Sequence, residues 1–278
     1  MKEYRYAVKF AYDGTLFDAF PPMNDKHTVV GEILKFLTET GLIESIETSR
    51  FSTASRTDRN VSAYGNVFCF NSLLEFKNVK DILSHNKTEI FFRTIAKVDL
   101  DFNPRHAAYR RYEYYLPYFL IYDKNKDYKR NFNEDTLFKL REALLLFRGE
   151  HDFINFSRRR TATKRTITNV SLDYEESLPY VIVKIDGHSF IWNMVRRIIS
   201  SAVKYASGEI ELSKIKNLLD TEKIVSSDMG IAPAEFLVLK DIVYDNAIFE
   251  DINFNNNSYQ KKNAFRYTVV GDIFKNLY

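Results

Sequence analysis

The sequence is short of the residues that build covalent cross-links and metal sites. Among 278 residues there is one cysteine, Cys69, so the chain cannot form an intrachain disulfide. The five histidines are scattered, and no group of cysteine and histidine has the spacing of a zinc site. These shortages exclude a disulfide-stabilised fold and predict no metal site.

Long apolar runs and glycine-rich turns are also missing. The first ten residues, MKEYRYAVKF, contain no extended apolar stretch, which predicts neither a signal peptide nor a membrane span. No motif for a nucleotide or redox cofactor is present. We therefore expect a cytoplasmic protein with no cofactor and no membrane partner.

Aromatic residues, by contrast, are plentiful. The chain contains 23 Phe and 18 Tyr, and its residues are 45% hydrophobic and 28% charged. This composition is typical of a globular protein with a sizeable aromatic core. The net charge is only +3, so the clustering of basic residues along the chain says more about partners than the total does.

Hydrophobic periodicity predicts the order of strands and helices. The predicted strands are 4–12, 67–70, 89–98, 110–120, 168–174, 180–185 and 236–244, and the predicted helices are 28–40, 135–148, 190–206 and 212–219. The order strand, helix, strands occurs twice without a strict β-α-β alternation, which predicts an α+β fold with a mainly antiparallel sheet. We predict two domains, 1–103 and 104–245, and an Asn-rich extension over 246–278.

One polar segment is the strongest candidate for chemistry. In it, Asp58 lies between Arg56 and Arg59, among turn-forming residues and between apolar segments. Catalytic groups are often placed on loops of this kind, and arginines within ~4–6 Å would keep the carboxylate ionised. The same pattern is also typical of a surface ion pair worth about 0–1 kcal/mol, and spacing alone favours that structural interpretation.

Six motifs, taken in order, favour the catalytic interpretation. They are YDGT at 12–15, RTD at 56–58 with VSA at 61–63, RRYEY at 110–114, GEHDF at 149–153, FIWNMVRRI at 190–198, and AP at 232–233 leading into LVL at 237–239. Together they resemble the TruA family of tRNA pseudouridine synthases, and their order agrees with that family over about residues 4–245. Three residues would be a weak match, whereas six ordered motifs are a strong one.

The resemblance implies a role for each matched residue. Asp58 would be the essential carboxylate that acts on the target uridine, Tyr112 would stack on the flipped base, and Arg196 would pair with Asp58. Arg56 would help to displace the base. Structural alternatives stay open: Tyr112 and Tyr114 share one face of a strand and both fit a core position, and Arg196 fits a solvent-facing position on its helix.

Basic residues flank the matched motifs, and we predict that they bind the phosphates of an RNA stem. The predicted substrate-binding residues are Arg56, Arg59, Arg110, Arg111, Tyr114, Arg158, Arg159, Arg160, Lys164 and Arg165. Charge runs are more often solvated surfaces, which is the competing interpretation. We predict that His151 and Asp152 orient a local loop and do not act as an acid–base pair.

The resemblance also implies an activity and an architecture. The activity is isomerisation of uridine to pseudouridine in the tRNA anticodon stem-loop, at positions 38, 39 and/or 40. The architecture is a homodimer of chains with two RRM-like (ferredoxin-like) halves, whose sheets join and leave a catalytic cleft between them. The alternatives are an inactive tRNA-binding protein and a synthase with another uridine target. A glycoside hydrolase ranks last, because Asp58 has no evident second carboxylate.

The sequence departs from the family pattern in two places. Asn60 stands where the commonest form of the motif has glycine, and we predict that the turn survives because asparagine tolerates positive φ. Asp18–Pro22 stands where the family often has a Gly-Trp-Gln-like segment. We therefore expect this N-terminal loop to contact RNA differently from the loop of other family members, and the choice of target uridine to differ with it.

Overall fold

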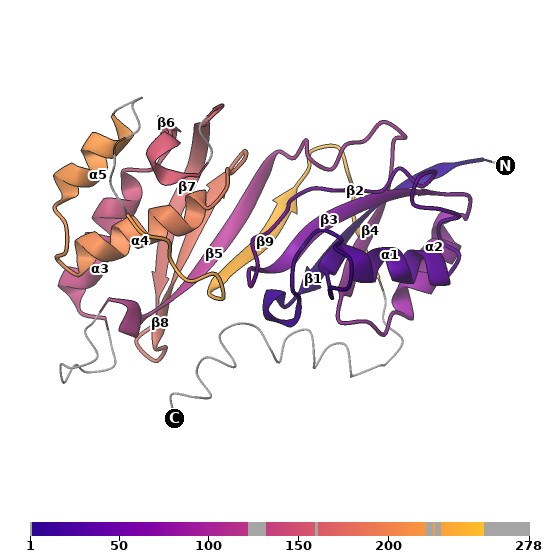
Figure 1. Ribbon diagram of the computed structural model, residues 1–278, viewed down its shortest axis with the longest axis horizontal. Helices are drawn as coiled ribbons and strands as arrows, with labels where there is room; N and C mark the ends of the chain where they lie inside the picture. Colours follow the sequence, from indigo (N-terminus) through magenta and orange to yellow (C-terminus); the bar gives the residue numbers. More distant parts are fainter. Residues whose placement is uncertain (1, 122–131, 159–160, 221–224, 226–228, 253–278) are drawn as a thin grey trace. The chain divides into compact units, whose positions relative to one another are not determined.

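The computed structural model describes residues 2–121, 132–158, 161–220, 225 and 229–252 (Figure 1). Contacts along the chain divide it into two compact units. Unit 1 comprises Met1–Ala108 together with the chain from Val238 onward, and unit 2 comprises Tyr109–Leu237. Both units combine helices with a mainly antiparallel sheet, so the prediction of an α+β fold is confirmed.

Unit 1 contains a sheet with the strand order β10–β4–β1–β3–β9, and β2 pairs with β3. Its strands are β1 (Tyr4–Tyr12), β2 (Ser52–Thr53), β3 (Ser62–Ser72), β4 (Phe91–Val98), β9 (Leu237–Val243) and β10 (Glu250–Asp251), and its helices are α1 (Val29–Glu39) and α2 (Phe76–Ser84). Neighbouring strands are antiparallel except β3 and β9, which are parallel. The sequence predicted β1 with its observed bounds and missed α2.

Aromatic rings join the helices of unit 1 to its sheet. The ring of Tyr6 on β1 lies 6.1 Å from that of Phe76 on α2, and Phe92 on β4 lies 5.2 Å from Phe36 on α1. Phe10 is paired with Phe92 in the β1–β4 register and shares the face of Tyr6, because side chains alternate along a strand. Both helices therefore pack on the same face of the sheet, around the predicted aromatic core.

Unit 2 contains antiparallel strands in the order β5–β8–β7–β6. Its strands are β5 (Tyr109–Pro117), β6 (Gly149–Asp152), β7 (Lys164–Tyr174) and β8 (Tyr180–Gly187), and its helices are α3 (Glu134–Leu145), α4 (Met194–Ala206) and α5 (Leu212–Leu219). The hydroxyl of Tyr205 on α4 donates to Glu142 on α3 at 2.6 Å. The predicted bounds of α5 agree with the observed ones.

Helix α4 begins later than the periodicity predicted. Asn193 precedes its first residue, Met194, and has a left-handed backbone with φ 62°. A left-handed residue cannot continue a right-handed helix, so Phe190–Asn193 lie outside it. The apolar pattern before Met194 therefore belongs to a turn, which exposes the side chain of Trp192.

The chain returns to unit 1 after unit 2. Strand β9 pairs with the start of β3, where Ser62 is opposite Val238, and β10 pairs with β4, where Glu250 is opposite Ile95. The unit boundaries accordingly lie at 108/109 and 237/238, whereas the sequence suggested 103/104 and 245/246. Glu250 and Asp251 of the expected extension contribute to this sheet, and residues 253–278 lie outside the described residues.

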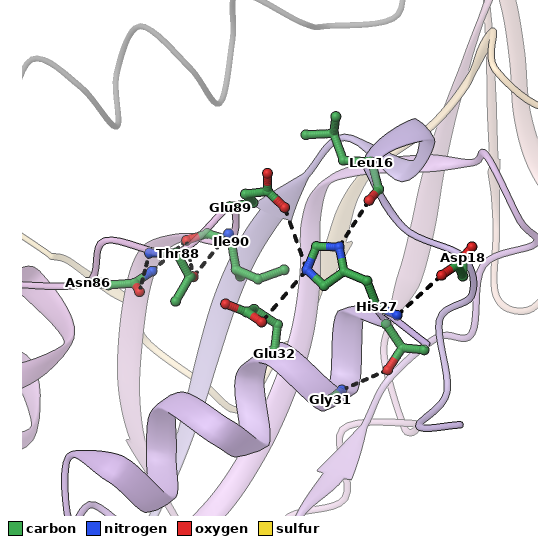
Figure 2. A network of polar contacts seen from close by, with 10 residues as sticks. Leu16, Asp18, His27, Gly31, Glu32, Asn86, Thr88, Glu89 and Ile90 are labelled. Carbon is green, nitrogen blue, oxygen red and sulfur yellow. Dashed lines mark hydrogen bonds and ion pairs between the residues drawn. The ribbon is translucent and has the colours of Figure 1, made fainter. Parts of the chain in front are cut away.

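Figure 2 shows the contacts of His27, in the loop between β1 and α1. Its Nδ1 lies 3.2 Å from the carbonyl oxygen of Leu16, and its Nε2 lies 3.7 Å from Glu32 and 3.5 Å from Glu89. Its backbone N–H donates to the Asp18 carboxylate at 3.2 Å, and its carbonyl accepts from Asp18 at 2.8 Å. The loop that departs from the family pattern is thus anchored to α1 and to the segment before β4.

Candidate active site

Asp58 lies in unit 1, in the loop between β2 and β3. Its backbone carbonyl accepts a hydrogen bond from the N–H of Val61 at 3.1 Å, which closes a four-residue turn. Asn60 has φ 66°, and Arg59 is not among the residues with positive φ, which is the pattern of a type II turn. The prediction that asparagine supports a positive φ in this turn is confirmed.

The YDGT motif supports the Asp58 loop. The backbone N–H of Gly14 donates to the hydroxyl of Ser62 at 3.0 Å, and the hydroxyls of Tyr12 and Thr57 lie 2.8 Å apart. Gly14 follows Asp13. The carboxylate of Asp13 accepts a hydrogen bond from the backbone N–H of Thr15, and so caps the short turn. Two motifs far apart in the sequence therefore meet at the base of the candidate catalytic loop.

The contact at Gly14 leaves no room for a side chain, and this leads to a prediction. A Cβ at Gly14 would lie 2.2 Å from the carbonyl oxygen of Val61, so the Asp58 turn would have to move. Gly14→Ala is expected to lower the unfolding free energy by roughly 2–4 kcal/mol, measured by urea denaturation.

Gly41→Ala is the matched control for Gly14→Ala. Gly41 has φ 68°, but an added Cβ would meet nothing within 4 Å. The expected loss is about 1 kcal/mol, from backbone strain alone. Equal losses in the two variants would contradict the argument from close packing.

Tyr112 and Tyr114 lie on one face of β5 in unit 2, and the structure separates their roles. Tyr112 is 9% exposed, and its ring lies 5.0 Å from that of Phe190 in an edge-on arrangement. Tyr114 has no exposed surface, and its hydroxyl donates to the carbonyl of Pro233 at 3.1 Å. Burial raises the pKa of Tyr114. Its predicted substrate contact is therefore corrected: Tyr114 is a core residue, and Tyr112 stays the candidate for stacking.

Arg196 lies in the first turn of α4 and is partly buried. Its Nε–H donates to the carbonyl of Ala232 at 2.7 Å, and the N–H of Ala232 donates back to the carbonyl of Arg196 at 3.1 Å. One terminal nitrogen of the guanidinium lies 3.5 Å from the side-chain oxygen of Asn193. The helix motif and the Ala-Pro motif are thus joined at Arg196, which does not simply face solvent.

Two predicted phosphate ligands on β5 have partners within unit 2. Arg110 is 7% exposed and donates to the carbonyl of His188 at 2.6 Å. Arg111 makes two hydrogen bonds to Asp186, at 2.8 and 2.7 Å, and these bonds raise its pKa. Neighbouring residues of a strand point to opposite faces, so the two arginines do not form one basic surface. These bonds stabilise unit 2. The phosphate contacts predicted for Arg110 and Arg111 stay predictions, and the Arg111 side chain is still 40% exposed beside Asp186.

The remaining predicted basic residues differ in exposure. Arg56 and Arg59 on the Asp58 loop are exposed, as are Arg158 and Lys164 in unit 2. Arg165 is half-buried, and its guanidinium donates to the carbonyls of Ala162 and Lys164 at 2.9 and 2.5 Å. The other two members of the cluster, Arg159 and Arg160, lie outside the described residues. The exposed arginines and lysine stay candidates for phosphate binding.

The GEHDF motif has a structural role. His151 Nε2 lies 3.1 Å from the carbonyl oxygen of Arg148, and the carboxylate of Asp152 accepts from the N–H of Ile154 at 3.0 Å. The prediction that both residues orient local backbone is confirmed. Phe153 and Phe156, which precede the basic cluster, are fully buried and belong to the core.

Other kinds of site find little support in the described part of the chain. Burial raises the pKa of the Cys69 thiol to about 12, so the thiol is protonated at neutral pH and is a poor nucleophile. Within the described ranges, no group of three or more His, Cys, Asp and Glu residues could hold a metal ion. No helix among these residues is long and apolar enough to cross a membrane.

One surface residue escaped the sequence analysis. Trp192 is 56% exposed and lies beside Arg158, whose guanidinium carbon is 5.3 Å from the centre of the indole ring. The periodicity placed Trp192 inside a helix, and the pair joins residues that are distant in the sequence. The signal that was available is the dipeptide Trp192-Asn193, because asparagine favours a left-handed turn.

Comparison with known proteins identifies similar chains over nearly the full length. A family model described as tRNA pseudouridine synthase matches residues 143–245. The protein named tRNA pseudouridine synthase A from Pyrococcus furiosus is 36% identical over 273 residues, which is 97% of this chain and 94% of the relative. Proteins of the same name from Thermococcus sibiricus and Methanobrevibacter smithii are 35% and 34% identical; each match covers 88% of this chain, and 87% and 85% of the relatives. The similarity therefore extends over both units.

Proposed function

We propose that this chain, which belongs to the TruA family of tRNA pseudouridine synthases, modifies uridine in the anticodon stem-loop, at position 38, 39 and/or 40. Membership of the family makes the chain an isomerase that acts on tRNA. The observation that carries the proposal is the 36% identity to a tRNA pseudouridine synthase A over 97% of the chain. The ordered motifs support the choice of the anticodon stem-loop.

The proposed reaction rearranges one nucleotide without net loss of atoms. The bond between C1′ and N1 breaks, the uracil turns while it stays bound, and C5 then bonds to C1′. N1 gains a proton, and the hydrogen of C5 leaves as a proton to solvent. Asp58 is the proposed carboxylate, and three routes satisfy this balance: addition to the sugar, addition to the base, and abstraction of a sugar proton.

The geometry within each unit supports the proposed roles. The Asp58 side chain is held on a closed turn braced by Gly14, which suits a group that must meet a reacting atom reproducibly. Tyr112 is braced edge-on by Phe190, as suits a ring that stacks on a flipped base. Arg196 is held by Ala232, and we propose that its guanidinium orients the Asp58 carboxylate.

RNA binding is proposed to depend on exposed basic side chains. Arg56 and Arg59 flank Asp58, so they are suited to phosphates beside the target nucleotide. Arg158 and Lys164 are suited to phosphates of the stem. By resemblance, the working form is proposed to be a homodimer in the cytoplasm.

The target is tested with tRNA transcripts that carry tritium at uridine C5. Because C5 loses its hydrogen when it bonds to C1′, each modified uridine releases one tritium to water. Transcripts with cytidine at position 38, 39 or 40 are expected to lose the corresponding share of the release. Release that is unaffected by all three changes would assign the enzyme another target, an outcome that the unusual Asp18–Pro22 loop makes worth testing.

A further inference from the structure

Trp192 is exposed although its backbone is firmly held. The N–H of Met194 donates to the carbonyl of Ile191 at 2.9 Å, which closes a turn with Trp192 and the left-handed Asn193 at its centre. The carbonyl of Trp192 accepts from the hydroxyl of Ser157 at 2.9 Å. The indole is therefore held at the surface by a defined backbone. Because the backbone is already fixed, stacking of a nucleobase on the indole costs little conformational entropy.

The surroundings of the indole are basic. The guanidinium of Arg158 lies against the ring, and the backbone N–H of Arg158 is 3.4 Å from the Trp192 carbonyl. Ser157 and Arg158 contact Trp192. In the sequence, the segments 157–165 and 188–198 contain several arginine and lysine residues and no acidic residue. An aromatic ring among positive charges is the usual composition of a surface that binds single-stranded nucleic acid.

A second exposed aromatic residue shows what distinguishes Trp192. Phe138 on α3 is 63% exposed, more than Trp192, but its sequence neighbours include Asp135, which pairs with Lys139 at 2.8 Å. Isolated exposed hydrophobic residues are common on protein surfaces. Trp192 differs because a fixed turn and an adjacent arginine accompany its exposure.

We propose that Trp192 and Arg158 form a stacking site for an unpaired base of the tRNA substrate, with Arg158 neutralising the phosphate beside that base. The proposal rests on tRNA being the substrate of this chain. Asn193, the neighbour of Trp192, contacts Arg196 at 3.5 Å, so the stacked base lies near the residues assigned to the reaction within unit 2. The site serves binding and contributes little to the chemical step.

Trp192 is the only tryptophan of the chain, so intrinsic tryptophan emission reports on this site alone. Unmodified tRNA transcript, added to the wild-type protein, is expected to quench the emission and to protect the indole from acrylamide. A stem-loop RNA should do the same, whereas a blunt duplex of equal length should not. Unchanged emission at saturating tRNA, with binding verified by filter retention, would overturn the site and leave the synthase activity standing.

Substitutions give an independent measurement through tritium release. Trp192→Leu is expected to raise the KM for tRNA by about 5- to 140-fold with kcat nearly unchanged, and Trp192→Phe should restore most of the loss. Phe138→Leu is the matched control and should behave as wild type. A KM for Trp192→Leu within about twofold of wild type would overturn the proposal. It would also be overturned if the tryptophan emission changed on dilution of the protein and not on addition of RNA, because the ring would then lie between two copies of the chain.

Discussion

Replacement of Asp58 by alanine is expected to abolish pseudouridine formation while tRNA binding is retained. Asp58 is the proposed carboxylate of the reaction, and it lies in the RTD motif at 56–58. Loss of a group that acts directly on the reacting atoms is expected to lower kcat by at least about 10³-fold. Tritium release measures the turnover, and filter retention of labelled tRNA measures the binding.

The control for this experiment is another carboxylate in a matched motif. Asp152 caps the N–H of Ile154, so Asp152→Asn should alter local stability and leave turnover close to wild type. Turnover by Asp58→Ala within tenfold of wild type would remove Asp58 from the reaction. A wild-type protein that binds tRNA and releases no tritium from any transcript would point to an inactive tRNA-binding protein.

Arg196→Lys is expected to have the second largest effect. Lysine keeps the positive charge but cannot reproduce the planar fork that orients a carboxylate, and it loses the Nε–H bond to Ala232. A misplaced carboxylate is expected to cost about 10²-fold in kcat with a small change in KM. The lost hydrogen bond should lower the unfolding free energy by about 1–3 kcal/mol, measured by urea denaturation.

Arg197→Lys is the matched control for Arg196→Lys, because it makes the same chemical change one position further along α4. A residue one position on points away from its neighbour's face, so kcat should stay near the wild-type value. If both variants lost kcat equally, the effect would come from the helix as a whole. If Arg196→Lys kept the wild-type kcat, the proposed pairing with Asp58 would be wrong.

The sequence alone determined the local structure and the chemistry-bearing motifs. Alternation from Tyr4 to Tyr12 predicted β1, and the helix period over 28–40 predicted α1. These predictions succeeded because strands and helices are encoded by neighbours in the sequence. The position of Asn60 on a left-handed turn was predictable for the same reason, since backbone preference belongs to the single residue.

Tertiary structure alone decided which side chains are available to a substrate. Tyr112 and Tyr114 have the same alternation and both are buried, but Tyr112 keeps 9% of its surface exposed, whereas Tyr114 keeps none and its hydroxyl donates to the carbonyl of Pro233. The pairing of Arg111 with Asp186, which lies far along the chain, is likewise visible only in the tertiary structure. Burial and pairing depend on contacts between distant segments, which no local pattern encodes, and the same contacts leave Trp192 on the surface beside Arg158.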